Sequence, residues 1–268
     1  MSDENPDEKE TKAKDEHLPE GEVIYRAIRQ DGDHALGESP ASLAWSGLAA
    51  GLSMGFSLAG EGLLKRTARG RVDTARQQVG YALGFLMVIL GRQQLFTEQT
   101  LTAMLPLFSA RRAPGIGANV ARLWIIVLVA NLAGAAAFAA AAAWTAAFSP
   151  EVQAAFLHIG QDALAPPGGA TFIRGIYAGF LIATMVWLLP GAGPSRLWIV
   201  IILAYIVGVA GLAHVIAGTA ECLFVVFKGE ATLSAYLGGF LVPSLLGNSI
   251  GGVALVASLA HGQHAPEG

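Results

Sequence analysis

Thr97 and His214 are the two side chains whose chemistry stands out, because each lies in a polar interruption of an otherwise apolar stretch. Thr97 carries a neutral hydroxyl, and His214 carries an imidazole that changes charge near physiological pH. Such groups suit a weak-acid anion that sheds water and gains a proton, and a permeation path needs weak binding of this kind. The alternative for His214 is a hydrogen-bonded core histidine.

Three further charges lie in the same apolar stretches. Arg92 and Glu98 flank the first interruption, and Glu221 follows His214 by seven residues. Seven residues make two helical turns, which would place Glu221 on the face of His214, roughly 10 Å along the axis. Isolated charges at membrane depth cost about 2.5 to 3.5 kcal/mol, so we expect Arg92 to pair with Glu98 or with Glu221. In the alternative, Glu221 lies near the lipid headgroups and is solvated.

The composition excludes most water-soluble classes. Of 268 residues, 53% are hydrophobic and 14% are charged, whereas soluble domains have about 25% charge. Residues 1–40 hold twelve of the 20 acidic side chains, and no basic face exists to bind nucleic acid. Cys222 is the single cysteine and forms no intrachain disulfide. No metal cluster, nucleotide loop or cofactor motif is present, so we expect no cofactor and no enzymatic activity.

Six apolar runs of membrane-spanning length lie between Ala41 and Ala260. They predict an all-α membrane protein with an acidic, largely disordered tail at 1–38, a transmembrane channel domain at 39–262 and a C-terminal tail at 263–268. A short surface helix is expected in the tail, near residues 23–29. The spans are expected at about 39–64, 79–106, 119–148, 171–189, 195–227 and 234–260. The second and fifth carry too many polar groups to be continuous lipid-facing helices.

The two sets of three spans share landmarks in the same order. Each set has a Gly-x-x-x-Gly in its first span, an interruption in its second and an Asn-x-x-Gly in its third. The matching positions are Gly47 and Gly51 with Gly175 and Gly179, and Asn131 and Gly134 with Asn248 and Gly251. An odd number of spans per repeat inverts the second copy, as in many channels and transporters. The alternative is chance, because such small-residue motifs are common in packed helices.

Several of these motifs together resemble the formate/nitrite transporter family over about residues 22–260. The motifs are Gly91 followed by Leu95-Phe96-Thr97, Gly211-x-x-His214, Phe172-x-Arg174-Gly175, and Pro243-x-x-x-Gly247-Asn248-x-x-Gly251-Gly252. The resemblance implies a homopentamer of aquaporin-like protomers, each with its own pore, broken helices 2 and 5, and both termini in the cytoplasm. It implies transport of formate, nitrite, hydrosulfide or related anions across the bacterial inner membrane.

The partners implied are therefore a small anion, a proton and the lipid bilayer. The resemblance places Thr97 on the interrupting loop, His214 as the central protonatable group and Leu95 near an apolar constriction. We place six residues along the substrate pathway: Thr97, His214, Leu95, Phe96, Asn131 and Asn248.

The chain also departs from the family pattern. Gln94 replaces an acid before Leu-Phe-Thr, Glu98 replaces a small residue after it, and Gly179 and Gly218 stand where asparagines are expected. This is the pattern of a divergent member, and it leaves the native substrate open. One alternative is an aquaporin-like channel for neutral solutes, although the paired Asn-Pro-Ala signature is absent. Another is a rhomboid-like intramembrane protease using Ser53, which however lies in the middle of a span.

Overall fold

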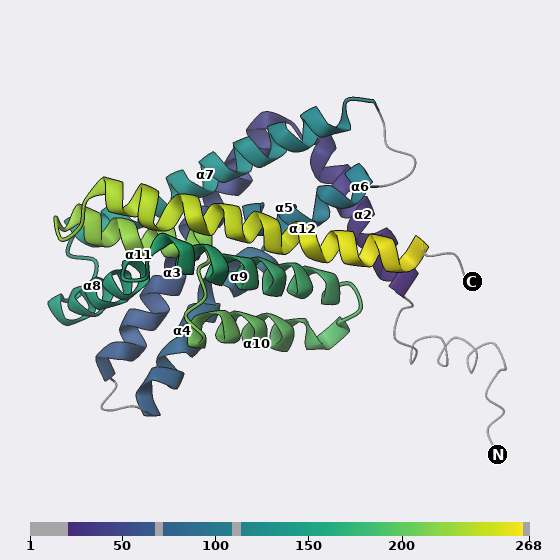
Figure 1. Cartoon of the computed structure of the whole chain (residues 1–268). Helices are drawn as coiled ribbons and strands as arrows, with labels where there is room; N and C mark the ends of the chain where they lie inside the picture. Colours follow the sequence, from purple (N-terminus) through teal and green to yellow (C-terminus); the bar gives the residue numbers. More distant parts are fainter. Residues whose placement is uncertain (1–20, 68–71, 109–113, 265–268) are drawn as a thin grey trace, which may run out of the picture.

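The computed structural model describes residues 21–67, 72–108 and 114–264, and every regular element in these ranges is helical (Figure 1). The first half contains α2 (Gly21–Gly37), α3 (Pro40–Thr67), α4 (Val72–Leu90), α5 (Phe96–Thr102), α6 (Met104–Phe108) and α7 (Ile116–Trp144). The second half contains α8 (Pro150–Leu164), α9 (Gly168–Leu188), a short 3₁₀ turn η1 (Gly193–Ser195), α10 (Arg196–Val209), α11 (Val215–Phe227), a π-helical segment η2 (Ala235–Leu241) and α12 (Val242–His264).

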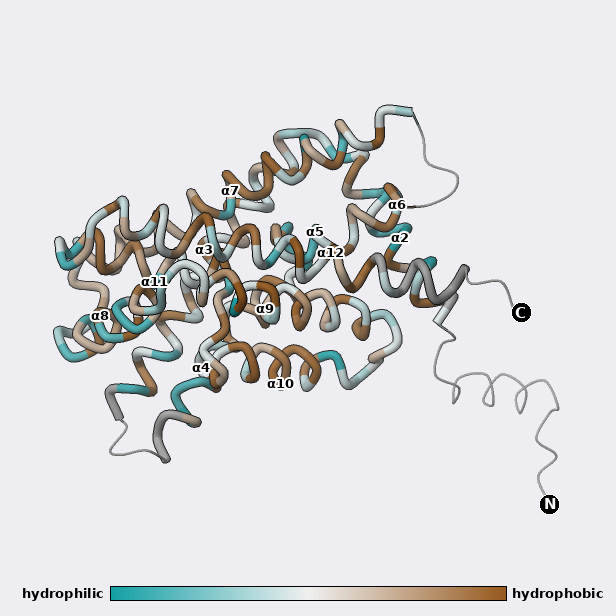
Figure 2. Tube along the Cα trace, viewed as in Figure 1, coloured by the Kyte–Doolittle hydropathy of each residue, from teal (hydrophilic) through white to brown (hydrophobic). Residues whose placement is uncertain are grey.

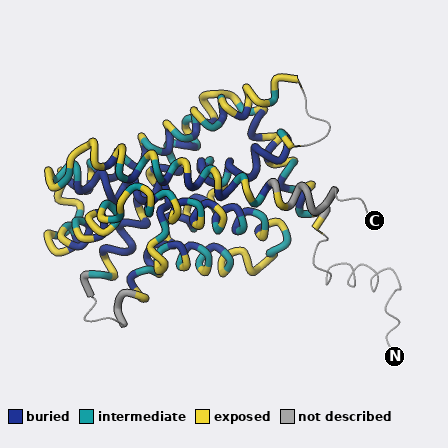
Figure 3. The backbone as a smooth tube through the Cα atoms, viewed as in Figure 1, coloured by how far each residue is buried: buried dark blue, intermediate teal, exposed yellow. Residues whose placement is uncertain are grey.

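Four helical segments of the described chain are long and apolar enough to cross a membrane. They are Pro40–Lys65, Ile116–Trp144, Gly168–Leu188 and Ala235–Val256. Hydrophobic residues continue onto the outer faces of the helices, and many of them are exposed (Figures 2 and 3). Trp45, Ile125 and Tyr177 are 72%, 63% and 63% exposed. A monomer in water seldom shows so much apolar surface, so these faces are built to meet lipid or other subunits.

Two helix pairs form the frame of the protein, α3 with α7 and α9 with α12. In the first pair, a Cβ atom on Gly51 would overlap the backbone of Asn131. In the second pair, a Cβ atom on Gly179 would overlap the backbone of Asn248. The predicted Gly-x-x-x-Gly and Asn-x-x-Gly motifs of each half therefore pack against each other, because only glycine allows the two backbones to approach so closely.

Two elements differ from the sequence expectation. Helix α2 extends from Gly21 to Gly37, so this part of the predicted disordered tail is helical and much longer than the short helix expected near 23–29. Residues 1–20 and 265–268, and with them the remaining tail predictions, lie outside the described ranges. Helix α8 was not expected; Pro150 occupies its first position, and Val152, Phe156 and Ile159 are buried along one face.

Candidate functional site

The helical backbone is interrupted at two places in the middle of the protein. Helix α4 ends at Leu90 and α5 begins at Phe96, while α10 ends at Val209 and α11 begins at Val215. The connecting segments, which we name loop A (residues 91–95) and loop B (residues 210–214), are equal in length. They fall where the sequence predicted interruptions of the second and fifth spans.

The two loops begin with the same turn. The N–H of Gln93 donates to the carbonyl of Val88 across 3.0 Å, as in a Schellman C-terminal cap. Arg92 then has a left-handed backbone (φ 49°) at the position where such caps favour glycine, and loop B has Gly211 (φ 59°) there. The equivalent hydrogen bond in loop B joins Leu212 to Val207, also at 3.0 Å.

Asn131 on α7 fixes loop A. Its amide nitrogen donates to the carbonyl oxygens of Gly47 (2.7 Å) and Gln94 (2.9 Å), and its carbonyl oxygen accepts from the N–H of Phe96 (2.8 Å). The side chain is fully buried. One amide thus satisfies backbone groups on α3, on loop A and at the start of α5.

Asn248 on α12 fixes loop B in the same manner. Its amide nitrogen donates to the carbonyl oxygens of Gly175 (2.9 Å) and Ala213 (2.8 Å), and its carbonyl oxygen accepts from the N–H of Val215 (2.8 Å). By this correspondence, His214 occupies the place in loop B that Leu95 occupies in loop A. Both asparagines contact backbone in the interior, and they hold loop A and loop B in place. Neither asparagine lines the cavities described below.

Thr97 and His214 meet at the centre of the molecule. Thr97 Oγ1 lies 2.9 Å from His214 Nε2, and both side chains are buried. The N–H of Ala217 donates to His214 Nδ1 (3.2 Å), which makes Nδ1 an acceptor. The neutral imidazole therefore carries its hydrogen on Nε2 and donates it to Thr97. The Thr97 hydroxyl hydrogen is then free to donate to another group, while Phe85 packs edge-on against the imidazole ring, 5.0 Å between centroids.

A cavity lies on each side of this contact. The first vestibule, about 140 Å³, is lined by Glu61, Gln78, Tyr81, Asp162, His214 and Glu221 among others. The second vestibule, about 280 Å³, is lined by Asp31, His34, Glu38, Arg92, Glu98 and Arg196 among others. The first takes residues from the beginnings of α4 and α9 and the end of α10, and the second takes residues from their opposite ends. The vestibules therefore open toward opposite ends of the protein, and each is large enough for several water molecules.

The predicted ion pairs of Arg92 are not made. Arg92 is exposed and lines the second vestibule, whereas Glu221 is buried in the first, so the two are separated by the central contact. Glu98 lines the same vestibule as Arg92, but no ion pair joins them, and Glu98 Oε1 has no hydrogen-bond partner in the described chain. The reason is local. The left-handed backbone at Arg92 belongs to the capping turn, and this turn determines the direction of the Arg92 side chain.

Glu221 and His214 both line the first vestibule. Sequence reasoning missed Glu61 there, although a buried acid within an apolar span is a signal in itself. It also missed Asp162 on α8, whose carboxylate lies 4.0 Å from Lys65 Nζ.

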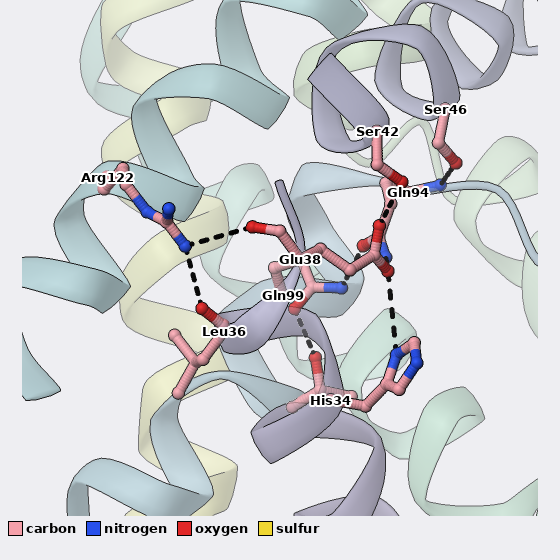
Figure 4. A network of polar contacts seen from close by, with 9 residues as sticks. His34, Leu36, Glu38, Ser42, Ser46, Gln94, Gln99 and Arg122 are labelled. Atoms are coloured by element: carbon pink, nitrogen blue, oxygen red, sulfur yellow. Dashed lines mark hydrogen bonds and ion pairs between the residues drawn. The ribbon is translucent and has the colours of Figure 1, made fainter. Parts of the chain in front are cut away.

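A polar network around Glu38 joins α2 to loop A at the second vestibule (Figure 4). The Glu38 carboxylate accepts from Ser42 Oγ (2.6 Å) and Gln94 Nε2 (3.1 Å), and it lies 3.7 Å from His34 Nδ1. Arg122 donates to the carbonyl oxygen of Glu38 (3.3 Å), at the end of α2. Gln94 thus binds an acid supplied by the N-terminal segment.

Apolar spanning helices, two interrupted helices that meet at Thr97 and His214, and a vestibule at each end define a polytopic membrane protein of the channel or transporter class. Residues 22–262 match the family model described as formate/nitrite transporter. The inner membrane protein YfdC of Escherichia coli (strain K12) is 36% identical over 242 residues, which are 90% of this chain and 78% of that protein. The chain belongs to the formate/nitrite transporter family.

Solved structures show the same fold. A pentameric formate channel with formate bound matches with a TM-score of 0.68 at 18% identity, over 86% of this chain and 96% of that chain. An FNT family ion channel matches with a TM-score of 0.79 at 16% identity, over 91% of this chain and 99% of that chain. These relatives are channels and transporters rather than enzymes, so the alternatives of an aquaporin-like channel for neutral solutes and a rhomboid-like protease are not favoured.

Proposed function

We propose that this protein is a channel or proton-coupled transporter for small monovalent weak-acid anions such as formate, nitrite or hydrosulfide. The observation that carries the proposal is the 2.9 Å contact between Thr97 and His214, between opposed vestibules. Thr97 is the second residue of α5 rather than part of the interrupting loop, so the contact joins the start of α5 to loop B. The family match and the formate-bound structural relative support the same substrate class.

The central contact offers hydrogen bonds without fixed charge. With the imidazole hydrogen on Nε2 engaged by Thr97, the threonine hydroxyl donates its own hydrogen to an anion that arrives from either vestibule. One neutral donor stabilises an anion only weakly, which allows release as well as entry. Leu95 and Phe96 are buried beside this point, and we propose that they form the apolar constriction. An ion that crosses it must lose water, so passage as the neutral acid lowers the barrier.

We further propose that the protomer has six spans in two inverted repeats with an aquaporin-like arrangement, and that both termini lie in the cytoplasm. The equivalent hydrogen bonds of Asn131 and Asn248 support the repeat. We also propose a homopentamer in the bacterial inner membrane, which the pentameric relative and the inner membrane protein of Escherichia coli support. The exposed apolar faces of α3 and α7, including Trp45 and Ile125, are then covered by lipid or by neighbouring protomers.

The test is anion flux into proteoliposomes, measured for formate and nitrite with the wild type, Thr97→Val and His214→Ala. Thr97→Val keeps the shape and removes the hydroxyl. A hydrogen bond to a charged group contributes about 1.5 to 3 kcal/mol, so we expect flux to fall about ten- to hundredfold. The matched controls are Thr184→Val, whose hydroxyl bonds only within its own helix, and His158→Ala, an exposed histidine. Wild-type flux no greater than that of empty liposomes would exclude the proposed function.

A further inference from the structure

Two buried carboxyl groups share the first vestibule with His214. Glu61 on α3 is 3% exposed and Glu221 on α11 is 8% exposed, and both line the cavity. Helices α3 and α11 pack against each other, which brings both carboxyl groups to the same cavity, where Gln78 also lies. Within the described chain, the Glu221 carboxylate has no hydrogen bond or ion pair. The Glu221 oxygens are not among the enclosed polar atoms that lack a partner, so the carboxyl group faces the cavity and can exchange a proton there.

The cavity favours a proton over a metal ion as the ligand of these carboxyl groups. Among the described residues, no group of three or more His, Cys, Asp or Glu side chains could hold a metal. Two carboxylates enclosed in one cavity of low dielectric repel each other, and a single shared proton removes the repulsion. Paired acids of this kind exchange their proton as one unit.

The neighbouring charges do not neutralise the pair. Lys65 acts on Glu61, but its ammonium lies 4.0 Å from the Asp162 carboxylate at the edge of the vestibule. Arg174 lines the vestibule and is exposed to solvent, which screens its charge. The titratable and charged groups that face the pair from the surrounding helices are Lys65, Tyr81, Asp162, Arg174, His214 and Cys222.

His214 is poorly placed to supply a proton itself. Its Nδ1 accepts the N–H of Ala217, so a second ring proton would set two N–H groups against each other. The same hydrogen bond prevents the ring from passing a proton from one nitrogen to the other. A proton delivered to an anion near Thr97 must therefore come from another group on the path.

We propose that Glu61 and Glu221 form a proton-binding carboxyl pair that protonates a weak-acid anion in the first vestibule before the anion reaches His214. The inference rests on the proposed function. The O–H bond of the protonated carboxyl breaks, an O–H bond of the neutral acid forms, and no electrons are exchanged. The pair, left as two carboxylates, regains its proton from water at the mouth of the vestibule.

The first test is the pH dependence of formate flux in proteoliposomes containing the full-length protein. In Glu61→Gln or Glu221→Gln, the remaining carboxyl loses the like charge of its partner in the pair, so we expect it to release its proton at a lower pH than the pair does. Flux that needs the protonated carboxyl falls as pH rises. We expect this fall to move to lower pH by about one unit or more, equivalent to about a tenfold loss of flux at a pH within the fall. Glu230→Gln, which removes an exposed glutamate outside the vestibule, should leave the profile unchanged. Profiles of both vestibule variants that superimpose on the wild type would overturn the proposal.

The second test does not depend on transport. Infrared spectroscopy of the purified wild type should show a protonated carboxyl stretching band at neutral pH. The part of this band that comes from the pair should be lost in Glu221→Gln and in Glu61→Gln. It should be kept in Glu98→Gln, which removes a buried carboxyl group of the second vestibule. Absence of the band from the wild type would overturn the proposed carboxyl pair. This outcome is measured on the wild type alone, so it does not depend on whether a variant folds. Absent wild-type flux with the band present would instead reject the proposed function and leave the proton site standing.

Discussion

Replacing Asn131 with alanine should destabilise the protein where α3, loop A and α5 meet. The side chain makes three buried hydrogen bonds of 2.7 to 2.9 Å to backbone groups on α3, loop A and α5. Each bond contributes about 1 kcal/mol, and each backbone group left unsatisfied in the interior adds a penalty of similar size. We therefore expect Asn131→Ala to lower the free energy of unfolding by about 3 to 5 kcal/mol.

Denaturant-induced unfolding in detergent, followed by tryptophan fluorescence, measures this loss. Asn119→Ala is the matched control, because Asn119 is exposed near the beginning of the same helix and should cost less than about 0.5 kcal/mol. Asn248→Ala should cost as much as Asn131→Ala, since its three bonds are equivalent. A loss below about 1 kcal/mol in Asn131→Ala, with loop A still ordered, would refute the view that this amide holds the loop.

Three other changes test single features. Arg92→Gly should stabilise the protein by about 1 kcal/mol, because it relieves a left-handed backbone at a residue without an ion pair in the described chain, and a lower melting temperature would contradict this. Gly211→Ala should destabilise it by about 1 kcal/mol for the converse reason, in the same thermal assay. Glu38→Ala should speed hydrogen exchange in α2 about tenfold by removing its bonds to Ser42 and Gln94; unchanged exchange would show that α2 is held by apolar packing.

The interruptions of the second and fifth spans were predictable because polar residues at membrane depth cannot face lipid. The same reasoning placed Thr97 and His214 at two separate interruptions, but it did not predict their direct contact. Helix α8 could also have been found, because Ser149-Pro150-Glu151 is a helix start and residues 152, 156 and 159 follow one face. These features depend on local sequence, which is what pattern reasoning captures.

The errors concern contacts between distant segments. Arg92 was expected to pair with Glu98 or Glu221, but its direction depends on a backbone turn that charge patterns do not reveal. Glu61 was overlooked because its partner, Glu221, lies on a helix 160 residues further along the chain. Which acid faces which cavity is decided by the packing of α3 against α11, and no spacing rule within one span contains that information.

Leu95 and His214 stand in corresponding slots of two matching loops, each tied down by an asparagine that touches only backbone. The asparagine hydrogen bonds hold the loop backbone and do not depend on the side chain at position 95 or 214. Position 95 can therefore carry an apolar side chain and position 214 a polar one without any change in the loop backbone. We therefore expect that either side chain can be exchanged while the asparagine hydrogen bonds that hold its loop stay in place.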